Sequence, residues 1–296
     1  MIAQSQSGTG KTAAFAIAIL SRINPSIQSS QALILAPTFE LAMQIGSVIE
    51  KLALFLPYIR IAYAVPGSRA SMIPNHFDGQ LLSEPIVIGT PGIIKKWCKQ
   101  KKIIDTHKLR ILCIDEADYM MAPEGMQQAC LSILNGLDHS SCQIMFFSST
   151  YSNEIIAFSR QCIQDPLVLR LGNRQMLADI RHFFIYCDDN QQKYDNIEQM
   201  YANLTIGQTM IFCQTIRNAL DLTMRLELSN HAVREIMSIL DIEQRKRNIE
   251  QFRAGVFGVL IATNIVARGS FISIIFFEGE IIFIHYFQAL MLMVSH

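Results

Sequence analysis

Short apolar runs alternate with segments of mixed polarity along most of this 296-residue chain. Each run is four to seven residues long. Continuous apolar runs of this length are typical of parallel strands that helices cover on both faces. The predicted strands are Ala32–Ala36, Ile59–Val65, Pro85–Ile88, Leu109–Ile114, Gln143–Phe147, His182–Cys187, Thr209–Cys213, Val233–Ile239 and Phe257–Ala262.

The segments between these runs have the spacing of helices. In Glu40–Phe55, for example, polar residues recur among apolar ones every three to four positions. Alternating strands and helices predict right-handed βαβ units and parallel sheets. Two consecutive α/β lobes, 1–171 and 175–296, fit this pattern, and a cleft between two lobes is a usual ligand site. The predicted helices are Ala13–Leu20, Glu40–Phe55, Asn190–Asn203, Ile216–Leu228 and Asp241–Ala254.

A glycine-rich loop stands near the start of the chain, at Ser5–Thr12, and a predicted helix follows it. Glycines let backbone N–H groups approach phosphate oxygens, the lysine reaches the β- and γ-phosphates, and the threonine hydroxyl suits Mg²⁺. A chance Gly-Lys-Thr in a turn is the alternative. The predicted phosphate-binding residues are Ser7, Gly8, Thr9, Gly10, Lys11 and Thr12.

An acidic quartet, Asp115–Asp118, directly follows a predicted buried strand. The carboxyl ends of parallel strands are where α/β sheets hold their ligands. Alone, such a quartet is usually a solvated loop, but together with Lys11 it favours a site for ATP and Mg²⁺. We expect Asp115 to hold the metal through water and Glu116 to polarise an attacking water molecule.

Composition bears on core formation, nucleic-acid binding and the redox compartment of the protein. Half of the residues are hydrophobic, which permits packed cores, and the formal net charge is zero, so nucleic-acid binding must come from local groups. One candidate is the group Lys95, Lys96, Lys99, Lys101 and Lys102, with a solvated helix face as the alternative. The odd number of cysteines, seven, without a Cys-x-x-Cys pair or a visible signal peptide, fits a reducing compartment.

The quartet Asp-Glu-Ala-Asp is the motif that names the DEAD-box RNA helicases, and other segments resemble motifs of this family in the family's order. Over residues 1–269 the chain therefore resembles a DEAD-box ATP-dependent RNA helicase. The matching segments are Pro37–Ala42, Thr90–Gly92, Ser148–Thr150, Ile211–Cys213, Glu243–Arg253 and Thr263–Gly269.

The resemblance implies two tandem RecA-like lobes that bind ATP and RNA and hydrolyse ATP to open short duplexes. It implies catalytic roles for Glu116, Asp115 and Lys11, with Thr12 and Asp115 at Mg²⁺. Ser148 and Thr150 would couple hydrolysis to lobe motion. Without the family match, the favoured interpretation of Ser148–Thr150 is a cluster of hydroxyl groups at the end of a strand. The residues implied to face RNA are Pro37, Thr38, Thr90, Pro91, Gly92 and Thr263.

A narrower resemblance concerns Phe39 and Ile93, where many members of the family carry arginine. These residues resemble the branch that works in mRNA export at the nuclear pore. The implied partners are mRNA and nuclear-pore and export factors, and the implied locations are cytoplasm and nucleus. We expect a monomer without a membrane span.

The chain also departs from the family pattern at both ends. Only four residues precede the glycine-rich loop, so we expect the first lobe to lack its N-terminal part, including a segment that reads adenine. No Lys or Arg follows Arg268, and Ser270–Phe271 replace an Ile-Asp pair, so the second lobe is expected to be truncated and atypical after 269.

The segment 271–296 is almost wholly apolar, has no predicted place in the lobe, and is too short for a membrane span once Glu278 and Glu280 interrupt it. Without arginines to stabilise the γ-phosphate, we expect poor hydrolysis. The alternative to an active helicase is a non-catalytic ATP- and RNA-binding fragment or a pseudogene-like product. A DNA helicase or another P-loop ATPase is disfavoured by the two motifs Asp115–Asp118 and Pro37–Ala42.

Overall fold

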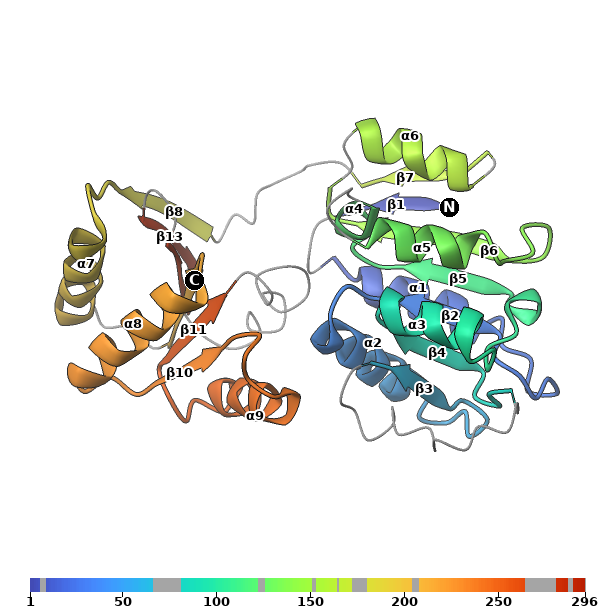
Figure 1. Cartoon of the computed structure of the whole chain (residues 1–296), viewed down its shortest axis with the longest axis horizontal. Coiled ribbons are helices and arrows are strands. Elements are labelled where there is room, and N and C mark those ends of the chain that lie inside the picture. Colours follow the sequence, from blue (N-terminus) through green and yellow to red (C-terminus); the bar gives the residue numbers. More distant parts are fainter. Residues whose placement is uncertain are drawn as a thin grey trace. The chain divides into compact units, whose positions relative to one another are not determined.

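The chain folds into two compact units, Met1–Asn173 and Arg174–His296, in the computed structural model (Figure 1). None of the helices that the structure describes has the length and apolar character needed to cross a membrane. The structure describes residues 1–5, 9–65, 81–121, 126–150, 153–163, 165–171, 180–203, 208–263, 281–286 and 290–295.

The first unit is built on a seven-stranded sheet with the order β3-β4-β2-β5-β6-β1-β7. All of its described strand pairs are parallel. The carboxyl ends of all seven strands therefore lie at one edge. The strands are β1 (Ile2–Gln4), β2 (Ala32–Leu35), β3 (Ile61–Ala64), β4 (Ile86–Gly89), β5 (Ile111–Ile114), β6 (Gln143–Ser148) and β7 (Val168–Arg170).

Helices cover both faces of this sheet. Leu33 and Leu35 of β2 pack into one core with α3, α4 and α5, while Ile34 of the same strand packs into a second core with α1 and α2. Because side chains alternate along a strand, a strand that is apolar throughout supplies both cores. The helices are α1 (Lys11–Leu20), α2 (Phe39–Leu52), α3 (Pro91–Lys95) with a π-helical segment (Lys96–Gln100), α4 (Ala117–Met121), α5 (Gln127–Leu134) and α6 (Asn153–Cys162), and one 3₁₀ turn spans Thr106–Lys108.

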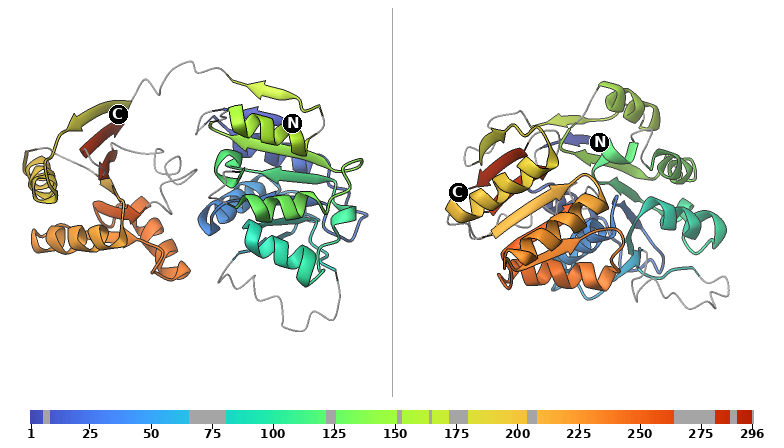
Figure 2. Two further views of the ribbon diagram at one scale, coloured as in Figure 1. Left: turned by 45° about the horizontal axis from the view of Figure 1, so that its top comes forward. Right: turned by 60° about the vertical axis from the view of Figure 1, so that its left-hand side comes forward.

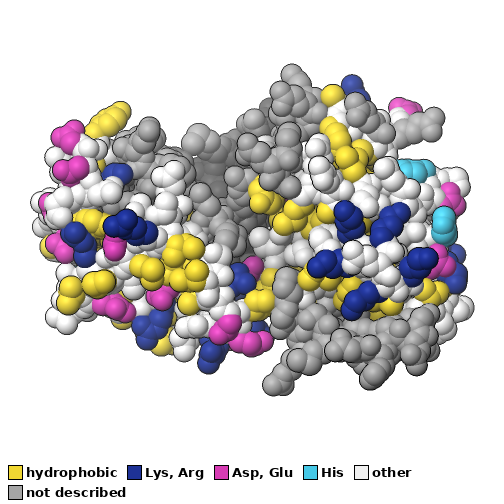
Figure 3. All heavy atoms as spheres, viewed as in Figure 1, with side chains coloured by type: hydrophobic (Ala, Val, Ile, Leu, Met, Phe, Trp, Pro, Cys, Tyr) yellow, Lys and Arg dark blue, Asp and Glu magenta, His cyan; other side chains and the backbone are white. Residues whose placement is uncertain are grey.

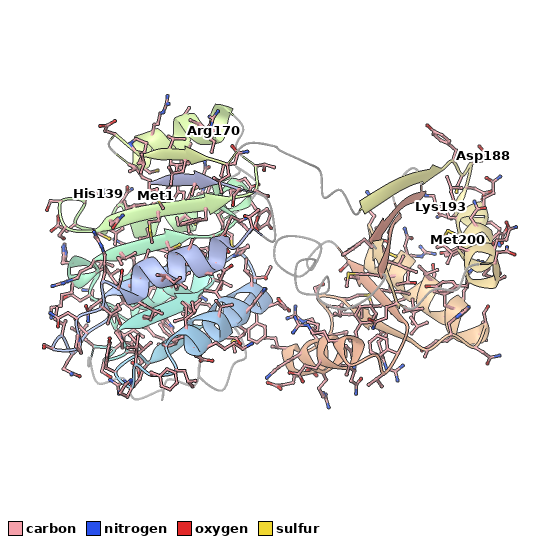
Figure 4. The ribbon with its side chains drawn as sticks, turned by 180° about the vertical axis from the view of Figure 1, so that it is seen from behind. Met1, His139, Arg170, Asp188, Lys193 and Met200 are labelled. Atoms are coloured by element: carbon pink, nitrogen blue, oxygen red, sulfur yellow. The ribbon has the colours of Figure 1, made fainter. Side chains whose placement is uncertain are left out.

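Strand β1 carries the chain into the glycine-rich loop and is only three residues long. It lies between β6 and β7, and Ile2 pairs with Phe146 and Val168. The Met1 ammonium donates to the Ile144 carbonyl at 2.8 Å. Figure 4, which labels Met1 and Arg170, shows β1 and β7 side by side, with α1 and α2 in front of the sheet.

The second unit contains a six-stranded sheet with the order β10-β11-β9-β12-β13-β8. Strand β13 runs antiparallel to both of its neighbours, and the other described pairs are parallel. The strands are β8 (Ile180–Ile185), β9 (Gln208–Cys213), β10 (Val233–Ile236), β11 (Val259–Thr263), β12 (Ile281–Tyr286) and β13 (Leu290–Ser295).

The helices of this unit are α7 (Asn190–Asn203), α8 (Ile216–Leu228) and α9 (Ile242–Arg253). Helices α7 and α8 lie beside each other (Figure 2), and the Arg225 guanidinium is 4.0 Å from the centre of the Tyr194 ring. Apolar residues of both helices share a core with β9 and β11. Helix α9 packs near β10, where the Asn248 side-chain amide donates to the Glu235 carbonyl at 2.8 Å.

The predicted fold class, α/β with parallel sheets, is confirmed. Every predicted strand and helix is present, and Asn190–Asn203 and Ile216–Leu228 have the predicted bounds. The other elements differ by a few residues at their ends. The sequence reasoning missed the helices α3 to α6 and the strand β7. Of these, α3 and α4 have five residues each and β7 has three, which is too brief to show a period.

One expectation was wrong. The apolar segment 271–296 was expected to have no place in the lobe, but two parts of it, β12 and β13, are strands inside the second sheet. Strand β12 pairs with β9 over its whole length, and β13 bridges β12 to β8. Backbone hydrogen bonds to a neighbouring strand on each side hold β12 and β13 in the sheet. The apolar sequence of this segment does not by itself predict that pairing.

Candidate functional site

The parallel sheet of the first unit brings most of the predicted site residues to one edge. Neighbouring strands β4, β2, β5, β6 and β1 all end there. Residues that follow or end these strands therefore lie at the same edge, although Ser5 and Ser148 are 143 positions apart in the chain (148 − 5). The strand-end residues are Thr90 after β4, Thr38 after β2, Asp115 after β5, Ser148 in β6 and Ser5 after β1.

The glycine-rich loop is held by polar contacts at its two ends. The hydroxyl groups of Ser5 and Thr9 are 2.6 Å apart, and the Lys11 ammonium donates to the Ser5 carbonyl at 2.7 Å. Gly10, which precedes α1, has φ 90°, a conformation that favours glycine. The predicted phosphate-binding residues Ser7 and Gly8 lie outside the described residues.

Asp115 is a buried carboxylate at the end of β5, with 3% of its surface exposed. Its N–H donates to the Leu35 carbonyl, and its Oδ1 accepts the Glu116 N–H at 3.0 Å. Burial raises the pKa of Asp115 to about 6, against the lowering effects of the Glu116 N–H and the Lys11 charge. Burial therefore makes the charged form of Asp115 less favourable than that of a solvent-exposed aspartate.

Glu116 lies in a strained backbone conformation, with φ 50°. A positive φ costs a non-glycine residue about 1–3 kcal/mol and is characteristic of functional sites. Burial raises the pKa of Glu116 to about 7, with further repulsion from Asp115 and Asp118, while Lys11 lowers it. Burial lowers the pKa of Lys11, and the three carboxyl groups raise it. These four charges thus form one electrostatic cluster.

The cluster has the chemistry of a site for Mg²⁺ and a nucleotide phosphate. Asp115 and Thr12 offer the oxygen ligands that Mg²⁺ prefers, and Thr12 follows Lys11 at the start of α1. Three carboxyl groups face one lysine in this cluster, and burial raises the pKa values of two of them, Asp115 and Glu116. A divalent cation fits this charge balance.

Two hydroxyl residues after β6 have different environments. The Thr150 hydroxyl donates to the Asp118 carboxylate. The Ser148 side chain is fully buried, and its hydroxyl has no hydrogen-bond partner in the described part of the chain. Sequence reasoning did not give Asp118 a role of its own; its position three residues after Asp115 was the available signal. The structure shows that Asp118 links the acidic quartet to the end of β6.

The residues predicted to face RNA in the first unit lie at the same edge. Thr38 caps α2, because its hydroxyl accepts the Leu41 N–H at 3.2 Å. The Thr90 N–H donates to the Ala64 carbonyl at 3.1 Å, which ties the start of α3 to β3. Pro37 and Pro91 are buried, whereas Gly92 is exposed, so the exposed glycine is the more accessible backbone contact.

Thr263 belongs to the second unit and ends β11. It is buried, and its hydroxyl has no hydrogen-bond partner among the residues that the structure describes. The remainder of its predicted motif, 264–269, lies outside those residues.

A parallel sheet whose carboxyl edge carries a glycine-rich loop, its lysine and an acidic pair defines the P-loop class of nucleotide-binding proteins. Residues 1–158 match the DEAD/DEAH box helicase family, and residues 192–275 match the helicase conserved C-terminal domain. The chain belongs to the DEAD/DEAH box helicase family.

Among curated proteins, the chain is 41% identical to human ATP-dependent RNA helicase DDX19A over 270 residues, which cover 91% of this chain and 55% of that protein. It is 42% identical to bovine ATP-dependent RNA helicase DDX25 over 270 residues, again 91% of this chain and 54% of that protein. The chain thus spans about half the length of these curated relatives.

Among solved structures, the chain resembles S. cerevisiae Dbp5 bound to RNA and ADP BeF3, with a TM-score of 0.81 and 33% identity. That match covers 91% of this chain and 66% of the Dbp5 chain. A Dbp5 variant bound to Nup159, Gle1, IP6 and ADP matches with a TM-score of 0.60 and 32% identity, covering 89% of this chain and 67% of that one.

Proposed function

We propose that this chain binds ATP and Mg²⁺ in its first unit and couples ATP binding and hydrolysis to RNA binding and local duplex unwinding. The observation that carries the proposal is the charge cluster of Lys11 with the buried Asp115 and the half-buried Glu116 at one sheet edge. The names of the similar proteins, ATP-dependent RNA helicases, support it. In this proposal, residues 1–171 form the ATP-binding lobe and residues 175–296 form the second helicase lobe.

Each group of the cluster has a proposed task. The backbone from Ser7 to Gly10 and the Lys11 ammonium hold the phosphates. The Thr12 hydroxyl and, through water, the Asp115 carboxylate hold Mg²⁺, which neutralises phosphate charge when bound. The Glu116 carboxylate orients a water molecule and accepts its proton.

Contact with RNA is proposed for the strand-end residues of both units. Ser148 and Thr150 couple ATP hydrolysis to motion of the lobes in this proposal. The hydrogen bond from Thr150 to Asp118 supports this role, since it joins the end of β6 to the acidic quartet. The proposed RNA-facing residues are Pro37, Thr38, Thr90, Pro91, Gly92 and Thr263.

We further propose that the chain acts as a monomer in mRNA export, in the cytoplasm and nucleus and at the nuclear pore. Its likeness to Dbp5, which has been solved in a complex with Nup159 and Gle1, supports this proposal. Proteins of the Nup159 and Gle1 kind are the proposed partners of this chain.

RNA-stimulated ATP turnover of the purified chain tests the proposal. Lys11→Ala should abolish turnover and weaken nucleotide binding, whereas Glu116→Gln should retain nucleotide binding and lose about 10²–10⁴-fold in turnover. Single-stranded DNA of the same sequence separates an RNA helicase from a DNA helicase. Equal binding of a fluorescent ATP analogue by the wild type and Lys11→Ala would contradict the proposed site.

A further inference from the structure

Five lysines form an exposed patch on the first unit, directly after Thr90–Gly92. All five side chains are exposed on α3, the π-helical segment and the turn that follows. Residues 91–110 hold seven basic residues and one acidic residue, a formal charge of +6, whereas the whole chain has 25 of each kind. The lysine patch consists of Lys95, Lys96, Lys99, Lys101 and Lys102.

The charge of the lysine patch is not compensated by its described surroundings. The single acidic residue of the segment, Asp105, pairs with Lys108 at 3.6 Å, and no described residue forms an ion pair with a lysine of the patch. Helix α5, which packs beside α3 in the same core, has no charged residue. Figure 3 shows basic side chains gathered on this face of the first unit.

The lysine patch lies on a helical segment that is anchored in the hydrophobic core. Ile94, Trp97 and Cys98 alternate with the lysines and are buried in the core beneath them, each at most 8% exposed. Ten helical residues from Pro91 to Gln100 extend about 15 Å. The lysines are therefore carried by a helical segment that is anchored in the core. This segment begins beside the proposed RNA contact at Thr90–Gly92 and leads away from it.

We propose that the lysine patch binds the phosphate backbone of an RNA strand that continues from Thr90–Gly92. An RNA long enough to reach the patch then binds more tightly than one that ends at Thr90–Gly92, without sequence preference. This inference rests on the proposed RNA-binding function. Phosphate contacts of this kind position a nucleic acid and carry no sequence information.

The composition of the patch favours RNA over an acidic protein as the occupant. Protein interfaces are depleted in lysine at their core and rely on aromatic or other large apolar anchors. None of the described residues in 91–110 is an exposed large hydrophobic residue. A regular row of phosphates needs no such anchor, because release of counterions supplies the driving force.

The test compares two four-site variants with equal changes in charge. The patch variant is Lys95→Gln/Lys96→Gln/Lys101→Gln/Lys102→Gln. The control variant is Arg22→Gln/Lys51→Gln/Arg160→Gln/Arg170→Gln, which neutralises four exposed residues elsewhere on the same unit. Fluorescence anisotropy measures the Kd for unstructured RNAs of about 6 and about 20 nucleotides, with a non-hydrolysable ATP analogue, across a range of salt concentrations.

For the long RNA, the patch variant should bind at least about tenfold more weakly near 0.1 M salt. The slope of its plot of log K against log salt concentration should be less steep by up to about 3, which is about 0.7 for each lost phosphate contact. For the short RNA, the patch variant should equal the wild type. The control variant should equal the wild type with both RNAs. Thermal unfolding of all three proteins should coincide, because the substituted side chains are exposed.

Two results would overturn the inference: wild-type affinity of the patch variant for the long RNA, or an equal loss with both RNAs. Patch-dependent binding of poly-glutamate with unchanged RNA binding would also overturn it and assign the patch to an acidic protein. Failure of the wild type to bind the short RNA would instead contradict the proposed function itself, so the two failures are distinguishable.

Discussion

Gly89, the last residue of β4, is where a single added methyl group should do the most structural harm near the proposed RNA contact. A Cβ at this position would lie 2.1 Å from the Ala64 carbonyl oxygen and 2.6 Å from the Ala64 Cβ. The obstacle is the backbone of the adjacent strand β3, which cannot rotate away as a side chain can. Gly89→Ala must therefore push β3 and β4 apart by roughly 1 Å to restore van der Waals distances.

The expected cost has two parts. Overpacking of a close contact costs about 1–3 kcal/mol. The Ala64 carbonyl also accepts the N–H of Thr90 at 3.1 Å, and loss of that hydrogen bond adds about 0.5–1.5 kcal/mol. Gly89→Ala should thus lower the free energy of unfolding of the first unit by about 2–4 kcal/mol, a large fraction of a typical domain stability of about 5–15 kcal/mol.

Urea unfolding followed by tryptophan fluorescence measures this loss. Trp97 is the one tryptophan of the sequence, is 4% exposed, and lies in the π-helical segment shortly after Gly89. Gly92→Ala is the matched control, because a Cβ there meets no atom within 4 Å and alanine favours the helix by about 0.5–1 kcal/mol. A wild-type midpoint for Gly89→Ala, or an equal loss in Gly92→Ala, would refute the reasoning.

Three further predictions concern packing, coupling and thiol reactivity. Gly46→Ala places a Cβ 2.0 Å from the Tyr63 hydroxyl and should cost about 1–3 kcal/mol in urea unfolding, but much less in a Tyr63→Ala background; equal costs would contradict the clash. Ser148→Ala should leave the unfolding midpoint unchanged or higher, because it removes a buried hydroxyl without a described partner, while RNA-stimulated turnover falls; destabilisation above about 1 kcal/mol would disprove this. Burial raises the pKa of Cys213 to about 12, so iodoacetamide at about pH 8 should modify it in urea and spare it in the folded chain, as mass spectrometry of the peptide can show.

The candidate site residues could be selected from the sequence because each motif is local. The loop at Lys11 and the acidic pair after β5 are recognisable from spacing and from the apolar runs that precede them. The hydrogen bond between Thr150 and Asp118 could not be predicted from spacing, since 32 positions separate the two residues and only the adjacency of β5 and β6 joins them. The strained φ of Glu116 likewise depends on the turn that the packed quartet adopts.

The sequence by itself determined most of the strands, the main helices and the residue types that a nucleotide site requires, because apolar period and motif spacing act over short stretches of chain. Only the tertiary structure decided the strand order that gathers Lys11, Asp115 and Ser148 at one edge, the burial that raises the pKa values of the acidic pair, and the pairing that places β12 and β13 in the second sheet. These features come from contacts between distant segments, whose hydrogen bonds and excluded water are properties of the folded state.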